Sequence, residues 1–223
     1  MSGYQGHWSV AHPHGILISW AVIMEGGFQV NKNGERFSDE SLGYSEQAAI
    51  VLAQPDGLAF DIFDRRIAAV ARQFADFRQA EAAGAVIEAP TLELLAARLN
   101  LPLAALAQSL AEVEEAKRTG NRDRFGRRFA GAPLAPPFKA VKVTGALFHT
   151  QGGLAVDAAA RVLDTSGKPL PNIFAAGGAA VGVSGPRAEG YLSGNGLLTA
   201  TVLGRVAGQA AAASVLQKAP TSG

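Results

Sequence analysis

The sequence predicts a mixed α/β fold, and three features of the 223-residue chain point to it. Apolar residues make up 48% of the chain and charged residues 17%, which is enough for a hydrophobic core of ordinary size. Residues 91–117 carry leucine and alanine at helical spacing, whereas residues 57–63 are largely apolar, as in a buried strand. The glycine-rich residues 177–196 follow a predicted strand, which is typical of ligand-binding loops in open α/β sheets.

Charge and cysteine content exclude several classes of function. Lysine and arginine number 20 against 19 acidic residues, so we expect neither a nucleic acid nor a membrane surface as a partner. The chain has no cysteine, which excludes disulfides, thiolate nucleophiles and iron–sulfur ligation. His12 and His14 have no third ligand nearby in sequence, so no metal site is expected. The beginning lacks a secretory signal and a spanning segment, and we expect a soluble, cytoplasmic protein.

The first half of the chain predicts a hairpin, a helix and a strand in that order. Residues 15–37 predict a β-hairpin, because alternating apolar residues after Gly26-Gly27 lead into a turn at residues 31–34. Ser45 is predicted to cap a helix that runs through Ala53. Residues 57–63 are predicted to form a buried strand.

The middle of the chain predicts two helices and a long connection. Thr91 is predicted to cap a helix that ends near Leu99, and Pro102 opens a second helix. Residues 119–137 are rich in arginine, glycine and proline and predict a long irregular segment, which is often functional in compact domains.

The last third predicts short strands followed by glycine and a final helix. Residues 140–143, 153–156 and 172–176 are each strand-like. The final helix is predicted from about Gly194 to about Leu216, and the last seven residues are expected to fray.

Three motifs in this chain occur in the order and spacing of a known family. The first consists of residues 26–31 and 34–40, the second of residues 149–157 and 161–163, and the third of residues 171–178, 194–198 and 204–208. Together they resemble the fumarate reductase and succinate dehydrogenase flavoprotein family, which includes ketosteroid dehydrogenase-like members. The resemblance extends over residues 12–208.

The resemblance implies an α/β flavin-binding, Rossmann-like domain that is interrupted by an α+β cap, or catalytic, domain. Residues 1–20 then correspond to the end of the first flavin-domain part, residues 21–143 to the cap and residues 144–223 to the C-terminal flavin-domain part. The family's G-x-G-x-x-G fingerprint has no counterpart here, so the flavin domain is expected to be partial and truncated. A matching N-terminal half, or self-association through uncovered strand edges, is therefore an expected partner.

The resemblance implies FAD as the cofactor, and two glycine clusters are its expected contacts. Bare backbone at the end of a strand lets a flat or anionic ligand approach the main chain, and a helix N-terminus favours negative charge. The expected cofactor-binding residues are Gly177, Gly178, Gly194, Asn195, Gly196, Leu197 and Leu198.

The family moves a hydride between flavin N5 and a carbon near a carbonyl or carboxylate of a small-molecule substrate. The resemblance implies that His149 and His12 face the substrate, where each could donate a hydrogen bond to a developing enolate oxygen. Arg36 matches an arginine of the family, but it could equally brace the cap by pairing with Asp39 or Glu40.

Tyr191 stands where fumarate-reducing members of the family keep a proton-donating arginine. A tyrosine offers one hydroxyl instead of a charged fork, which favours neutral or ketone-bearing substrates over dicarboxylates. Arg187 is an alternative cation, whereas His7 and His14 are expected to be bystanders. A second hypothesis is a non-catalytic remnant that binds a partner or a small ligand.

Overall fold

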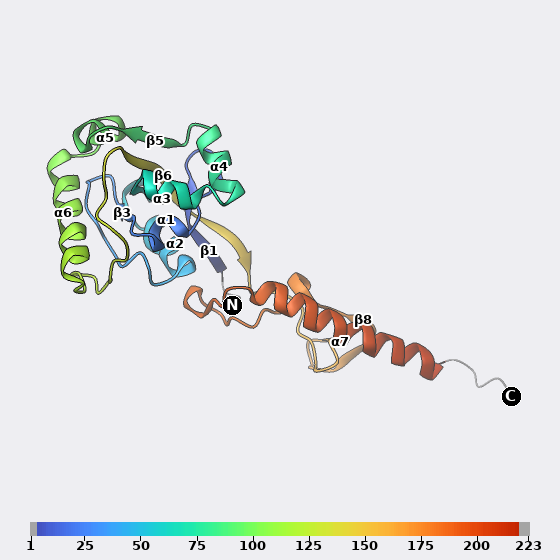
Figure 1. The fold of residues 1–223 in the computed structure, drawn as a ribbon. Helices are drawn as coiled ribbons and strands as arrows, with labels where there is room; N and C mark the ends of the chain where they lie inside the picture. The colour runs from blue at the N-terminus through green and yellow to red at the C-terminus, as the bar shows by residue number, and fades with distance from the viewer. Residues whose placement is uncertain (1–3, 219–223) are drawn as a thin grey trace. The chain divides into compact units, whose positions relative to one another are not determined.

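The computed structural model describes residues 4–218, which divide into two compact units (Figure 1). The sheet unit comprises residues 6–146, and the terminal unit combines residues 4–5 with residues 147–218. Part of the C-terminal segment for which fraying is expected, residues 219–223, lies outside the described residues. The assignment of residues 21–143 as a cap stays a prediction.

An antiparallel sheet with the strand order β2-β1-β6-β4-β3 forms the centre of the sheet unit, and β5 also pairs with β6. The strands are β1 (Tyr4–Ala11), β2 (Ile16–Leu17), β3 (Phe28–Val30), β4 (Leu58–Asp64), β5 (Val86–Ala89) and β6 (Phe138–Thr150).

Strand β4 confirms the predicted buried strand and lies between β3 and β6. Gln29 of β3 is directly opposite Asp61, and Ile62 is opposite Ala140 of β6. All residues of β4 after Leu58 are buried, so both faces of this strand are covered. This double burial explains why the sequence is apolar at almost every position rather than at alternate ones.

Helices pack around this sheet and close its core. They are α1 (Ala21–Met24), α2 (Tyr44–Leu52), α3 (Arg65–Ala71), α4 (Ala75–Ala82), α5 (Leu92–Leu99) and α6 (Leu103–Thr119). Helices α2 and α3 contact β4, and α5 contacts β5 and α6. The largest fully buried side chains include Trp8, Phe28, Phe63 and Phe77. As predicted, the Thr91 side chain accepts a hydrogen bond from the Leu94 backbone N–H and so caps α5.

Two local predictions in this unit are wrong. The predicted hairpin over residues 15–37 does not form, because β3 pairs with β4 while Arg36 turns into a buried polar cluster. The turn itself exists, since the Gly34 N–H donates to the Asn31 carbonyl at 2.9 Å. Gly43, not Ser45, is the N-cap of α2, and the Ser45 hydroxyl instead accepts from the Gly6 N–H at 3.3 Å.

The terminal unit is built from a two-stranded sheet and a long helix. Strand β7 (Arg161–Leu163) pairs antiparallel with β8 (Pro169–Phe174), and α7 (Asn195–Lys218) packs against β8 and the short helix η2 (Gly177–Ala179). The small buried core consists of Val162, Ala175 and Ala180. The final helix is confirmed within one or two residues of its predicted start and end.

The predicted strand at residues 153–156 is wrong. This segment makes only isolated bridges, from Leu154 to Ala180 and from Val156 to Val162. It crosses from one partner to another instead of running along a single strand, so no ladder can extend. Across residues 4–218, no helix has both the length and the apolar character needed to cross a membrane.

Candidate active site

The terminal unit brings His149 and Tyr191 together. Their ring centroids lie 5.5 Å apart with a 47° angle between the ring planes. His149 is near the end of β6, and Tyr191 directly follows the short helix η3 (Ala188–Gly190). Both residues are candidates from the sequence, and the fold therefore joins two candidates that lie far apart in the chain.

Two buried glutamines hold the His149 ring. The His149 Nε2 atom lies 2.7 Å from the Gln5 Oε1 atom, and the Gln151 Nε2 atom donates to the same oxygen at 2.7 Å. The Ser184 backbone N–H donates to the Gln151 Oε1 atom at 3.2 Å. Sequence reasoning missed both glutamines. Gln151 lies within the His149 motif and could have been noticed, whereas Gln5 is 144 residues from His149 and carries no sequence signal.

The same network reaches the beginning of α7 through Ser184. The Ser184 hydroxyl accepts hydrogen bonds from the Leu192 N–H at 3.3 Å and from the Asn195 side-chain amide. Asn195, a predicted cofactor residue, is buried with its side chain on this hydroxyl. This contact fixes the entry into α7, so the side chain of Asn195 has a structural partner of its own.

The two glycine clusters belong to elements that pack together. A Cβ atom at Gly177 would meet the Ala200 Cβ of α7 at 3.2 Å, whereas Cβ atoms at Gly178, Gly194 or Gly196 would meet nothing within 4 Å. Leu197 and Leu198 lie in the first turn of α7, with exposed fractions of 80% and 62%. Open backbone beside exposed leucines fits a flat, partly apolar group such as the flavin ring, and the assignment of these residues to the cofactor stays a prediction.

Of the other predicted site residues, His12 belongs to the sheet unit, whereas Arg187 directly precedes the short helix η3, which Tyr191 follows. His12 is exposed in the turn after β1, where its backbone N–H donates to the Lys142 carbonyl at 2.8 Å, and its role stays a prediction. Arg187 is exposed and pairs with Glu189 at 3.3 Å. Within the described residues, no cluster of three histidine or acidic side chains could hold a metal ion.

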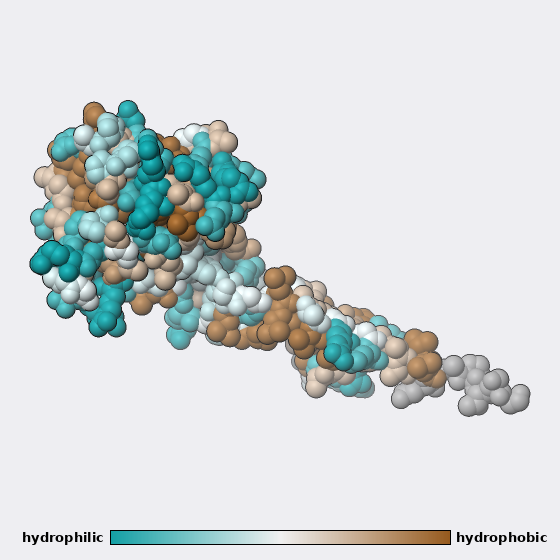
Figure 2. All heavy atoms as spheres, viewed as in Figure 1, coloured by the Kyte–Doolittle hydropathy of each residue, from teal (hydrophilic) through white to brown (hydrophobic). Residues whose placement is uncertain are grey.

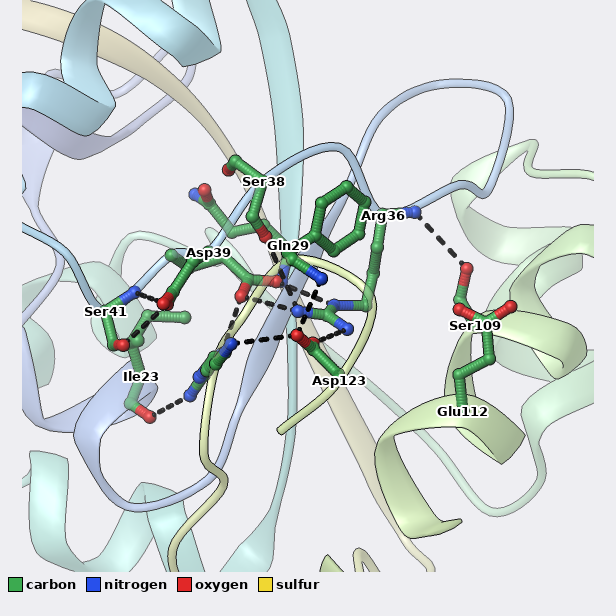
Figure 3. A network of polar contacts seen from close by, with 12 residues as sticks. Ile23, Gln29, Arg36, Ser38, Asp39, Ser41, Ser109, Glu112 and Asp123 are labelled. Atoms are coloured by element: carbon green, nitrogen blue, oxygen red, sulfur yellow. Dashed lines mark hydrogen bonds and ion pairs between the residues drawn. The ribbon is translucent and has the colours of Figure 1, made fainter. Parts of the chain in front are cut away.

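Arg36 lies in a buried network of the sheet unit (Figure 3). Its guanidinium forms a two-pronged contact with Glu40, at 3.0 and 2.9 Å, and a further ion pair with Asp123 at 2.6 Å. The sequence leaves Asp39 and Glu40 open as bracing partners of Arg36, and in the structure the partner is Glu40. The Asp39 carboxylate instead accepts from the Ser41 hydroxyl and N–H.

Arg127 completes this network and balances its charge. Its guanidinium donates to Glu40 at 2.8 Å and to the Ile23 carbonyl at 2.7 Å. Burial disfavours the charge of Glu40, but the ion pairs with Arg127 and Arg36 outweigh it and lower the pKa of this carboxyl. With Asp123, two guanidinium groups face two carboxylates. Arg36 is therefore fully engaged inside the sheet unit, which indicates the bracing role.

The comparison with known families places the chain. The family model described as "FAD binding domain" matches residues 2–197. The chain therefore belongs to this family of FAD-binding oxidoreductases, of the fumarate reductase and ketosteroid dehydrogenase type, and the match indicates FAD as the cofactor.

Several known proteins are similar over most of the chain. A probable fumarate reductase, Ifc3, of Shewanella frigidimarina is 34% identical over 217 residues, which cover 96% of this chain and 36% of that protein. The open conformation of a flavocytochrome c3 fumarate reductase superposes with a TM-score of 0.72 at 32% identity, over 94% of this chain and 36% of that one. A 3-ketosteroid Δ1-dehydrogenase from Sterolibacterium denitrificans gives 0.71 at 25% identity, over 95% and 43%. The chain thus spans little more than a third of the length of each of these two fumarate reductases.

Proposed function

We propose that this chain forms the substrate-carbonyl side of an FAD-dependent oxidoreductase that adds or removes hydrogen across a carbon–carbon bond next to a carbonyl. The observation that carries this proposal is the His149–Tyr191 pair, which lies in the same unit as the two open glycine segments. FAD, when bound, supplies the two-electron redox chemistry, and the protein supplies binding and orientation.

The open backbone around the start of α7 would hold the cofactor. Gly177 and Gly178 end the strand side of this surface, and Gly194, Gly196 and Leu197 form the helix side. Main-chain N–H groups at a helix N-terminus favour an electron-rich partner. The exposed leucines would cover the apolar part of a planar ring.

Tyr191 is proposed to donate a hydrogen bond to the substrate carbonyl, and His149 lies beside it. A carbonyl next to the reacting bond gains negative charge on its oxygen as hydrogen is added or removed. A phenolic hydroxyl aimed at that oxygen stabilises the charge, and a neighbouring imidazole can hold or move a proton. The 5.5 Å separation of the two rings allows both to face one small group.

A ketone is the proposed substrate class rather than a dicarboxylate. Binding a carboxylate well calls for a guanidinium fork, and Tyr191 has no such fork. Two arginines of the terminal unit are already paired, Arg161 with Asp157 at 2.7 Å and Arg187 with Glu189. Their charge is partly offset by these carboxylates, and the third arginine, Arg205, lies within α7. The phenol is proposed as the partner for the substrate because it lies beside His149.

Flavin retention and reoxidation test this proposal. The chain, alone and mixed with a polypeptide that carries the dinucleotide fingerprint, is passed with FAD through gel filtration, and we expect flavin absorbance to coelute. Chemically reduced flavoprotein is then mixed anaerobically with cyclohex-2-enone, and reoxidation is followed by absorbance. We expect Tyr191→Phe to slow reoxidation by about 10²–10³-fold, as for loss of one oxyanion donor. The exposed-loop variant Ser166→Ala serves as the control.

Two results would contradict the proposed function. If the chain retains no flavin, neither alone nor mixed with that polypeptide, the enzyme hypothesis for this chain is wrong. Retained flavin with an unchanged rate in Tyr191→Phe would remove the assigned role of the phenol.

A specific observation also favours a second candidate function, a partner-binding module. Apolar side chains are exposed along α7, and brown surface recurs along this helix in Figure 2. They are Leu197, Leu198, Val202, Val215 and Leu216. We propose that a polypeptide carrying the fingerprint covers this helix, since large exposed apolar surface is rare on monomers. Light scattering after gel filtration should show a complex or self-association, and a stable lone monomer that ignores that polypeptide would contradict it.

A further inference from the structure

We infer that Gln5 and Gln151 are positioning residues that hold His149 with its proton on Nε2, so that Nδ1 is the ring atom offered to the substrate. This inference rests on the proposed function, because it concerns how His149 takes part in it. Nothing in the family match assigns either glutamine a role, and both lie in the terminal unit with His149.

The assignment starts from the Ser184 backbone. A backbone N–H can only donate, so the Gln151 atom that lies 3.2 Å from the Ser184 nitrogen must be the amide oxygen. The other end of the Gln151 amide, its NH₂ group, therefore faces Gln5. Because that group donates, the atom of Gln5 at 2.7 Å must be the oxygen.

The orientation of Gln5 then fixes the proton on His149. The Gln5 oxygen lies 2.7 Å from His149 Nε2, and a hydrogen bond at that distance to an oxygen acceptor requires a proton on the nitrogen. Reversing Gln5 alone would place two NH₂ groups against each other. Reversing both amides would place the Gln151 NH₂ group against the Ser184 N–H. Only one arrangement satisfies all three contacts.

Two further features belong to this network. The Gln5 Nε2 atom is buried and has no hydrogen-bond acceptor among the described residues, which is a cost of the orientation that the other three contacts require. A Cβ atom at Gly182 would overlap the Gln151 amide oxygen. The glycine thus leaves the space in which Gln151 meets the Ser184 N–H, and the geometry of the network depends on it.

In this arrangement the Tyr191 and His149 rings have different roles. A neutral imidazole with its proton on Nε2 can only accept at Nδ1, and it can donate there only after binding a second proton. Tyr191 is then the donor that a ketone oxygen meets, while neutral His149 accepts a hydrogen bond or a proton at Nδ1. The expectation from the sequence is that His149 itself donates a hydrogen bond to the enolate oxygen. Under this assignment Tyr191 is the donor instead.

Nitrogen NMR of the full chain tests the inference without substrate or flavin. Histidine is labelled with ¹⁵N, and long-range proton–nitrogen spectra are recorded at about pH 9, where imidazoles are neutral. His7 provides an internal reference, because its Nδ1 accepts from the Ser9 N–H and its proton must lie on Nε2. We expect His149 to show the same pattern as His7. A proton on His149 Nδ1 would overturn the inference.

Two isosteric variants with the same change of charge sharpen the test. In Gln151→Glu, both carboxylate oxygens accept, so Gln5 must reverse and donate, and the His149 proton should move to Nδ1. In Gln5→Glu, the carboxylate still accepts from Gln151 and His149, so the proton should stay on Nε2. The same pattern in both variants would contradict the inference, and if Gln151→Glu fails to fold, the native and Gln5→Glu spectra decide.

The outcome is separable from that of the proposed function. Reoxidation unchanged in His149→Ala, together with a proton on Nε2, would remove the catalytic role of His149 and leave the positioning network intact. Slow reoxidation in His149→Ala with a proton on Nδ1 would do the reverse.

Discussion

Two buried titratable side chains of the sheet unit have pKa values far from their ordinary ones, in opposite directions. Burial lowers the pKa of His7 to about 4, although the hydrogen bond from Ser9 partly opposes this. Burial raises the pKa of Asp61 to about 7, despite hydrogen bonds from Ser9 and Gln29, and the charge of Glu40 adds to the increase. Both groups are therefore mostly uncharged in the native state near pH 6.

The two groups predict opposing pH dependences of stability. The unfolded state binds a proton at His7 below its ordinary pKa of 6.5, so this residue makes stability rise as pH increases from about 4 to 6.5. The folded state keeps the Asp61 proton up to about pH 7, so this residue makes stability fall as pH increases from about 4 to 7. At ~1.4 kcal/mol per pKa unit, the two contributions are each on the order of 3–5 kcal/mol, and because their signs are opposite they largely cancel between about pH 4 and 6.5.

In Asp61→Asn, the effect of His7 on the pH dependence of stability should become measurable, because the opposing effect of Asp61 is lost. The new amide can still bond Gln29 and Ser9 but cannot titrate, so the free energy of unfolding should rise between about pH 4 and 6.5 relative to the native chain. Urea unfolding at several pH values measures this difference. His7→Phe should show the opposite slope in the same window, and parallel pH profiles for all three proteins would contradict these pKa directions.

At the scale of elements, the buried ion pairs attach the long connection between α6 and β6 to the rest of the sheet unit. Asp123 and Arg127 belong to this segment, and both bind partners from the segment that follows β3. The Arg36 and Arg127 guanidinium groups also lie over the Phe129 ring, at 4.9 and 3.9 Å from its centroid. An irregular segment is thus held in place by side chains rather than by backbone ladders.

Arg36→Ala should destabilise the sheet unit strongly. It leaves Glu40 and Asp123 buried with fewer cationic partners, and breaking such a buried pair costs about 3–5 kcal/mol. Residues 120–137 should then become sensitive to limited proteolysis, which mass spectrometry of the fragments detects. The control Arg118→Ala removes an exposed pair with Glu115 and should change stability by less than about 0.5 kcal/mol. Equal effects of the two variants would contradict the bracing role.

The elements differ in how well the sequence predicts them, for physical reasons. β4, α5 and α6 are predictable because local periodicity and the residues at their ends agree with their tertiary burial. α7 is mostly exposed and is predictable from its alanine-rich composition and the glycine before it. The hairpin prediction fails because the burial of Arg36 outweighs a local turn signal. In the candidate site, His149 and Tyr191 are recognisable from motifs, whereas Gln5 becomes visible only once the fold brings it to His149.

At the scale of the whole molecule, the two units differ in their cores. The sheet unit buries a large hydrophobic cluster that includes Trp8, Phe28, Phe63 and Phe77. Among the described residues of the terminal unit, the buried hydrophobic cluster has three members, Val162, Ala175 and Ala180. Because apolar burial supplies most of the folding free energy, the terminal unit should be much the less stable of the two in the isolated chain.

Hydrogen exchange should reveal this difference directly. Amides of β4 and the paired part of β6 should exchange at least about 100-fold more slowly than amides of β7, β8 and α7 when no cofactor or partner is added. FAD or a partner polypeptide should slow exchange in α7 selectively, by mass action on the folded state. Equal protection of β4 and α7 in the isolated chain would contradict the unequal cores.

The central claim is that Tyr191 makes the site prefer a ketone over a dicarboxylate. The most direct test compares the rates at which a cyclic enone and fumarate reoxidise the reduced flavoprotein. For the native protein, we expect cyclohex-2-enone to react at least about 10-fold faster than fumarate, and we expect Tyr191→Arg to shift this ratio toward fumarate because it restores a carboxylate-binding fork. A native protein that prefers fumarate, or a ratio that Tyr191→Arg leaves unchanged, would contradict the account.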